Sequence, residues 1–277
     1  MTPTTVDTLP VPGASLYYKV QGSGPLLLML QGGDGDAEGS DGVAAHLIDR
    51  YTVVSYDRRG LSRSKLDSPE AIPVGLATHG EDAHRLLEAL TSEPAFVFGS
   101  SIGALISLDL VARHPEQVHT LVAHEAPTPE LLTSAERTAA EGFQKDIEET
   151  FRREGAAAAM KKFMVVAGDF NDREPDVQLP QPNPQRAANL EFFLAHDAPA
   201  VRLYRLDIAA LTAAATHIVV GAGLTDREAW THHCASALAE RLGAKLAEFP
   251  GGHNGYALHP RAFAARLDEI LTDAMGS

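Results

Sequence analysis

The chain has 277 residues, with 37 acidic and 23 basic side chains, so its formal net charge is −14 at neutral pH. Hydrophobic residues make up 44% and charged residues 22%, which is the composition of a folded globular protein and argues against disorder. The acidic surplus argues against nucleic-acid binding, and the single cysteine, Cys234, excludes an intramolecular disulfide and any cysteine-rich zinc site.

Short apolar runs along the chain predict buried strands. The first run, 15–20, alternates in polarity and precedes a Gly-Pro turn, which favours an antiparallel edge hairpin. The runs 25–31 and 217–222 are apolar throughout, as in strands covered on both faces of a parallel sheet. The complete set of strand candidates is 15–20, 25–31, 51–57, 95–100, 118–124, 217–222 and 245–250.

Helical patterns fill most of the intervals between these runs, at 77–91, 102–113, 228–243 and 260–274. Such alternation of strand and helix predicts an open α/β sheet with right-handed crossovers. One stretch lacks a buried strand and instead has helical patterns at 134–165 and 185–212 around a proline-rich loop at 169–184. We therefore expect a helical cap at 126–215, inserted between core segments 1–125 and 216–277.

The motif that carries chemistry is Gly99-Ser-Ser-Ile-Gly103, which ends one predicted strand and opens a helix. This is the G-x-S-x-G pattern of a nucleophile elbow, in which flanking glycines permit a sharp turn between strand and helix. The turn would expose the side chain of Ser101 at the carboxyl end of the strand. It would also point the amide of Ile102, at the helix amino terminus, toward a developing oxyanion.

A serine hydroxyl needs a base, because it is weakly nucleophilic at neutral pH. His253 is the leading candidate, since it follows the last predicted strand on a Gly-rich loop and should reach the same sheet edge as Ser101. His232, His233 and Cys234 are neighbours on a predicted helix, where adjacent side chains diverge, so they make a poor metal site.

With these motifs in place, nearly the whole chain resembles the α/β-hydrolase fold superfamily. The resemblance rests on the elbow, on Leu30-Gln-Gly-Gly33, on Tyr56-Asp-Arg-Arg-Gly-Leu-Ser-Arg-Ser64 and on Gly252-His253. It implies a mostly parallel eight-stranded sheet with helices on both faces and an inserted cap. Val122-Ala-His-Glu-Ala-Pro127 is also similar to the branch that includes zearalenone-type lactone hydrolases.

The family's oxyanion hole usually combines the amide after the nucleophile with one from the first strand–helix loop. The resemblance therefore implies Ile102 and Gly33, with Gly32 close by. Many members have His-Gly in this loop, where the present chain has Gln31-Gly32. Glycines at this point allow the backbone to approach a substrate closely.

Two carboxylates compete to orient His253. Asp226 has the commoner position in the superfamily, whereas Glu125 has the position used in some branches. Asp226 is accounted for as the N-cap of a helix beginning near 227, but a glutamate buried at a strand end lacks a structural reason. We therefore favour Glu125 and keep Asp226 as the alternative acid.

These residues predict a serine hydrolase that cleaves an ester or lactone of a small, largely apolar substrate through an acyl-enzyme. The mechanism requires no organic cofactor and no metal. A serine at the elbow argues against epoxide hydrolases and haloalkane dehalogenases of this fold, which use aspartate there. Perhydrolase or haloperoxidase-like activity, C–C bond hydrolysis and a small-ligand receptor of the same fold remain as alternatives.

The sequence also gives expectations about location and partners. Residues 1–7 have neither a basic nor an apolar segment of a secretory signal, and the apolar run 25–31 is far shorter than the ~20 residues that span a bilayer. We therefore expect a cytoplasmic protein that binds a small molecule and neither a membrane nor a nucleic acid. Homodimer formation is left open.

Overall fold

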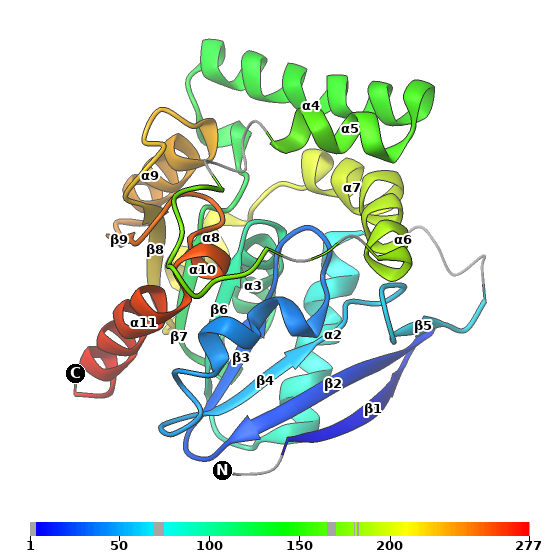
Figure 1. The fold of residues 1–277 in the computed structure, drawn as a ribbon. Helices are drawn as coiled ribbons and strands as arrows, with labels where there is room; N and C mark the ends of the chain where they lie inside the picture. Colours follow the sequence, from blue (N-terminus) through cyan, green and yellow to red (C-terminus); the bar gives the residue numbers. More distant parts are fainter. Residues whose placement is uncertain (1–3, 69–74, 165–169, 180, 182, 277) are drawn as a thin grey trace.

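A mixed β-sheet forms the centre of the computed structural model, which describes residues 4–68, 75–164, 170–179, 181 and 183–276 (Figure 1). Its strand order is β1-β2-β4-β3-β6-β7-β8-β9, and the two-residue strand β5 pairs with β2. Strands β3, β4 and β6 to β9 run parallel, while β2 is antiparallel to its partners β1, β4 and β5. The strands are β1 (Thr5–Val11), β2 (Ala14–Gly22), β3 (Leu26–Leu30), β4 (Thr52–Tyr56), β5 (Lys65–Leu66), β6 (Ala95–Ser100), β7 (Val118–His124), β8 (His217–Gly223) and β9 (Lys245–Phe249). The mostly parallel sheet predicted from the sequence is confirmed, with β5 as an addition to the eight strands of the main order.

The predicted hairpin at the sheet edge involves a strand that the sequence did not indicate. β1 pairs with β2 across a turn at Gly13, whose φ of 81° favours glycine. β1 therefore forms the edge, and the predicted strand at 15–20 lies one place further in as β2. Most β1 side chains are exposed, so the strand carries no apolar pattern and depends on its pairing with β2.

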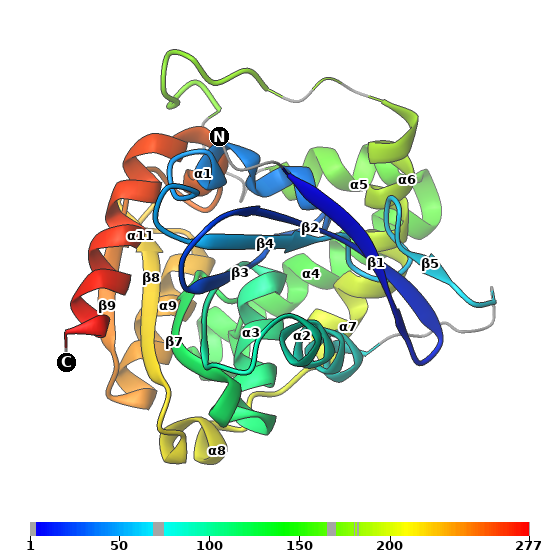
Figure 2. The same ribbon diagram turned by 90° about the horizontal axis from the view of Figure 1, so that it is seen from below.

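Helices cover both faces of the sheet, as seen from below in Figure 2. One face packs against α1 (Asp41–Ala44), α10 (Gly255–Leu258) and α11 (Pro260–Met275), and the other against α2 (Leu76–Leu90), α3 (Ile102–Arg113) and α9 (Trp230–Leu242). α8 (Ile208–Ala213) lies on α3 and α9. The period of two in β3 divides its side chains: Leu27 and Met29 join the core under α11, while Leu28 and Leu30 join the core under α3. Both faces are thus buried, as the uniformly apolar strands predicted.

Helices between β7 and β8 lie above the carboxyl ends of the strands (Figure 1). They are α4 (Ser134–Glu154), α5 (Ala156–Phe163), α6 (Pro184–Phe192), a π-helix (Phe193–Asp197) and α7 (Ala198–Leu203). A capping box of Thr133 and Glu136 begins α4, and Gly155, with a φ of 85°, separates α4 from α5. α8 falls within the range predicted for the cap but packs against α3 and α9, which cover the sheet.

Part of the predicted cap, residues 165–169, 180 and 182, lies outside the described residues. Within the described part of the chain, no helix combines the length and the apolar character needed to cross a membrane.

Candidate active site

The elbow forms a tight turn from β6 into α3, with Ser101 at its apex. Ser101 has a φ of 55°, a left-handed conformation that is rare for a residue with a side chain. A Cβ on Gly99 would come within 2.5 Å of the Gly103 carbonyl oxygen, and one on Gly103 would clash with the Leu30 carbonyl oxygen. Both glycines are therefore required for the strand, turn and helix to approach this closely.

Glu125 meets His253 at the same edge of the sheet. The carboxylate Oε2 lies 2.8 Å from His253 Nδ1 and also accepts a hydrogen bond from the hydroxyl of Thr231 at 2.8 Å. Its Oε1 accepts a hydrogen bond from the amide of Gly223 at 2.9 Å. Because the ionised carboxylate only accepts, Nδ1 carries the proton and Nε2 of His253 keeps its lone pair for a general base.

Glu125 is ionised in this setting. Burial by itself raises the pKa of its carboxyl, but the hydrogen bond and charge of His253 and the hydrogen bond of the Gly223 amide hold that pKa well below its usual range. Burial lowers the pKa of the neighbouring His124 to about 4, and this ring packs edge-on against Phe249 and Phe263. We therefore assign His124 to core packing as a neutral group.

Asp226 lies near this cluster without a hydrogen bond to His253 in the described part of the chain. Its carboxylate sits beside Gly252, where an added Cβ would come within 2.7 Å of Oδ2. The N-cap role predicted for Asp226 is wrong, because α9 begins only at Trp230, with Ala229 at the N-cap and no side-chain cap. Asp226 instead accepts a hydrogen bond from the Ala229 amide through its backbone carbonyl at 2.8 Å, closing the turn before the helix.

The loop predicted to complete the oxyanion hole lies against Ser101. A Cβ on Gly32 would stand 3.6 Å from the Ser101 Cβ, and one on Gly33 would stand 3.8 Å from the Phe193 ring. Gln31, which replaces the usual histidine of this loop, donates its side-chain amide to Ser40 Oγ at 2.7 Å and is buried. The Ile102 amide begins α3 beside this loop.

Arg58 fixes the peptide orientation of that loop. Its Nη1 donates to the carbonyl oxygens of Gln31 (3.1 Å) and Gly32 (2.9 Å), and its Nη2 donates to that of Gly33 (2.7 Å). Nη2 also donates to Asp197 Oδ2 at 2.9 Å, although Asp197 lies on the π-helix of the cap. This contact ties the roof of the site to the loop beneath it.

Asp197 is entirely buried and also faces His79, whose Nε2 lies 3.3 Å from Asp197 Oδ1. Burial alone raises the pKa of the Asp197 carboxyl, but the charge of Arg58 and the hydrogen bond of His79 make the net change a lowering. Arg58 belongs to the Tyr56–Ser64 motif noted in the sequence, but its ion pair with Asp197 was not predicted. No local sequence pattern around Asp197 indicates this partner.

We predict that Asp197→Asn lowers the free energy of unfolding by about 3–5 kcal/mol, since it leaves the buried Arg58 charge without its counter-ion. For a chain of this size, the melting temperature should fall by roughly 10 °C. The matched control is Asp146→Asn, which breaks the exposed pair of Asp146 with Lys162 on the cap and should cost at most about 1 kcal/mol. Equal losses in the two variants, measured by thermal denaturation, would contradict this assignment.

A pocket lies between this edge of the sheet and the cap, with Ser101, Ile102 and His253 in its wall. About 570 Å³ of space not occupied by protein atoms lies here, part of which is open to solvent. Its remaining lining is mostly apolar and comes chiefly from the cap: Pro127, Phe143, Gln144, Ile147, Glu148, Phe163, Phe193, Ala198, Val201, Trp230 and Thr231. Such a lining suits a ligand with an apolar body.

The large apolar and aromatic side chains of the cap divide into two groups. Phe143, Phe163 and Phe193 line the pocket, whereas Phe151, Met160, Met164, Phe192 and Tyr204 do not. Tyr204, for example, donates its hydroxyl to Asp109 at 2.6 Å, and Met164 is 41% exposed. Trp230 also lines the pocket, although it follows β8 and lies outside the predicted cap.

Cys234, the one cysteine of the chain, does not line this pocket. Cys234 packs with Leu132 and Ala140, and burial raises the pKa of its thiol to about 12. Within the described part of the chain, three metal-ligand side chains gather only at Glu81, His84 and His114, none of which lines the pocket. His232 and His233 face different acids, Glu125 and Glu136.

Comparison with known proteins gives consistent results. Residues 25–160 match the family model described as alpha/beta hydrolase fold. The chain is 41% identical to the uncharacterized hydrolase YraK of Bacillus subtilis, over 95% of each chain, and 26% identical to the zearalenone hydrolase of Bionectria ochroleuca, over 96% of this chain and 97% of that one. The enol-lactonase of Burkholderia xenovorans has a similar fold, with a TM-score of 0.72 and 20% identity over 98% of this chain and 100% of that one.

Proposed function

Because the chain belongs to the α/β-hydrolase fold family, we propose that it is a serine hydrolase of esters or lactones with small, largely apolar groups. One observation carries the proposal. His253 lines the same pocket as Ser101, and its Nδ1 lies 2.8 Å from Glu125 Oε2, which orients the imidazole ring. A nucleophile, a base and an orienting acid are the parts that acyl transfer needs.

In the proposed reaction, the Ser101 hydroxyl attacks the substrate carbonyl while His253 Nε2 accepts its proton. The amides of Ile102 and Gly33, with Gly32 adjacent, stabilise the oxyanion of the tetrahedral intermediate. His253 then gives its proton to the leaving alcohol, and an acyl-serine remains. A water molecule, deprotonated by His253, attacks this ester and releases the acid, which returns the serine hydroxyl.

Two observations support an ester or lactone as the substrate class. The pocket lining is mainly aromatic and aliphatic, which favours an apolar acyl or aryl group over a charged one. Among the similar proteins are a zearalenone hydrolase and an enol-lactonase.

The test is steady-state turnover of aryl esters and aryl lactones by the wild-type protein. We expect many turnovers per chain and a higher kcat/KM for apolar acyl groups than for acyl groups bearing a carboxylate. A single turnover followed by retention of the ligand would favour a small-ligand receptor instead. Faster cleavage of a diketone would favour C–C bond hydrolysis, and peroxide-dependent halogenation without esterase turnover would favour a haloperoxidase-like enzyme.

A further inference from the structure

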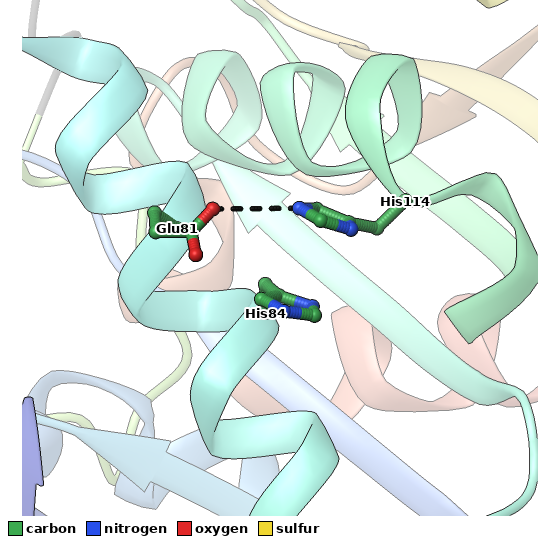
Figure 3. Close-up of side chains that lie close together, drawn as sticks. All are labelled: Glu81, His84 and His114. Atoms are coloured by element: carbon green, nitrogen blue, oxygen red, sulfur yellow. Dashed lines mark hydrogen bonds and ion pairs between the residues drawn. The ribbon is translucent and has the colours of Figure 1, made fainter.

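A second cluster of side chains that can bind a metal lies away from the pocket, where α2 packs against the C-terminal end of α3. Glu81 and His84 belong to α2, and His114 is the C-cap residue of α3 (Figure 3). Glu81 and His84 are three residues apart, so they share one face of their helix. The rings of His84 and His114 stack with centroids 3.7 Å apart and an interplanar angle of 7°.

The donor atoms of these three residues converge. One ligand atom from each lies within 4.8 Å of the other two, and His114 Nε2 is 3.4 Å from Glu81 Oε2. Two ligands of a tetrahedral zinc ion, each about 2.0–2.1 Å from the metal, are about 3.3 Å apart. The Glu81–His114 separation therefore already has the value that a shared metal requires.

His84 is held in the form that a metal ligand needs. Its Nδ1 lies 2.8 Å from Gln117 Oε1, which can only accept a hydrogen bond, so Nδ1 carries the proton and Nε2 presents a lone pair. Metal-binding histidines are commonly oriented in this way by an oxygen acceptor on their other nitrogen. Gln117 belongs to the short 3-10 helix Pro115–Gln117, just after His114.

Local charge also favours a cation at this place. The cluster lies at the C-terminal end of α3, where the helix dipole is negative, and Glu116 Oε1 is 3.8 Å from His114 Nδ1. Two features oppose metal binding. The Arg85 guanidinium donates a hydrogen bond to Glu81 at 2.9 Å. The stacked rings of His84 and His114 must also tilt before both can bind the same metal ion. The side chains of Arg85 and Glu81 are both more than one-third exposed, so the Arg85 guanidinium can turn into solvent and leave the Glu81 carboxylate to the metal.

We propose that Glu81, His84 and His114 bind one borderline divalent cation, such as Zn²⁺, with water as the remaining ligand. Imidazole and carboxylate donors suit this class, whereas Ca²⁺ and Mg²⁺ prefer oxygen ligands alone. The metal joins α2 to the end of α3 and so has a structural role. Ser101 lies at the other end of the 12-residue α3, about 18 Å away, which keeps the metal apart from the reacting groups.

The experiment is a calorimetric titration of the metal-free protein with Zn²⁺, repeated with His84→Ala, His114→Ala and Glu81→Gln. We expect one site whose affinity falls at least ~10-fold in each variant. Gln117→Leu keeps all three ligands and removes only the group that orients His84, so its affinity should also fall, by about 10-fold. The matched control is His46→Ala, which removes an exposed histidine outside the cluster and should leave the site unchanged.

Co²⁺ absorption provides a second readout, because a tetrahedral site with nitrogen ligands gives intense visible bands that an octahedral ion in solution lacks. We expect these bands in the wild type and their loss in His114→Ala, with circular dichroism showing that the variant is folded. The proposal is overturned if Zn²⁺ does not bind, or if its affinity and the Co²⁺ bands survive in the folded His84→Ala and His114→Ala variants.

Discussion

Ser101→Ala is expected to lower kcat for aryl esters by at least about 10⁴-fold while the melting temperature stays near that of the wild type. The reason is that the methyl side chain cannot form the acyl bond, whereas the pocket and the amides beside it remain. The same substitution should abolish covalent labelling by a fluorophosphonate, which reacts with an activated serine. Both measurements use the same purified protein.

Ser100 provides the matched control for this experiment. It precedes Ser101 directly, is buried at the end of β6, and its hydroxyl has no hydrogen-bond partner in the described structure. Ser100→Ala should therefore keep both turnover and labelling. If Ser101→Ala were still labelled, or if the folded wild type failed to react, Ser101 would not be the nucleophile.

Glu125→Gln is expected to lower kcat by about 10³–10⁴-fold, with little change in KM. The amide retains the size of the side chain but loses the charge that stabilises the imidazolium and selects the Nδ1-protonated form of His253. Asp226→Asn should change kcat by less than about threefold, because the hydrogen bond to His253 comes from Glu125. The opposite pattern in these two variants would reassign the acid to Asp226.

Glu125 should also make its contribution to stability over a wide pH range. Its pKa in the folded protein is lowered, so the stabilisation is fully present above the pKa of an unfolded glutamate and is lost as the pH falls through the lower folded value. Thermal unfolding of the wild type and Glu125→Gln at several pH values measures this. The difference between them should persist at pH 5 and shrink only in stronger acid.

The parts of the site that depend on local sequence could be predicted from the residues alone. The elbow is specified by five consecutive residues, in which a Cβ on either glycine would clash with backbone atoms. α3 begins and ends at the same residues as its apolar pattern. Glu125 was favoured over Asp226 because burial at a strand end left it without a structural reason. In the structure it is 1% exposed and hydrogen-bonded to His253.

The parts that depend on long-range packing could not be predicted. Arg58 and Asp197 are 139 residues apart, and only the seating of the cap on the sheet brings them together. His84 and His114 meet because α2 packs on α3, which no spacing rule for a single helix reveals. The N-cap role expected for Asp226 failed for a local reason instead, since the turn from Asp226 to Ala229 delays the start of α9.

The left-handed backbone at Ser101 costs stability, so the most active sequence of this site is not the most stable one. Ser101 and Glu125 have φ values of 55° and 45°, each at a cost of about 1–2 kcal/mol that a glycine would avoid. Selection for thermal stability alone would therefore favour glycine at position 101 and erase the nucleophile. At position 125 the ionised carboxylate, bonded to His253, Thr231 and Gly223, offsets the cost of the backbone. Programmes that stabilise this protein should leave these two positions fixed and take their gains from the exposed helices of the cap.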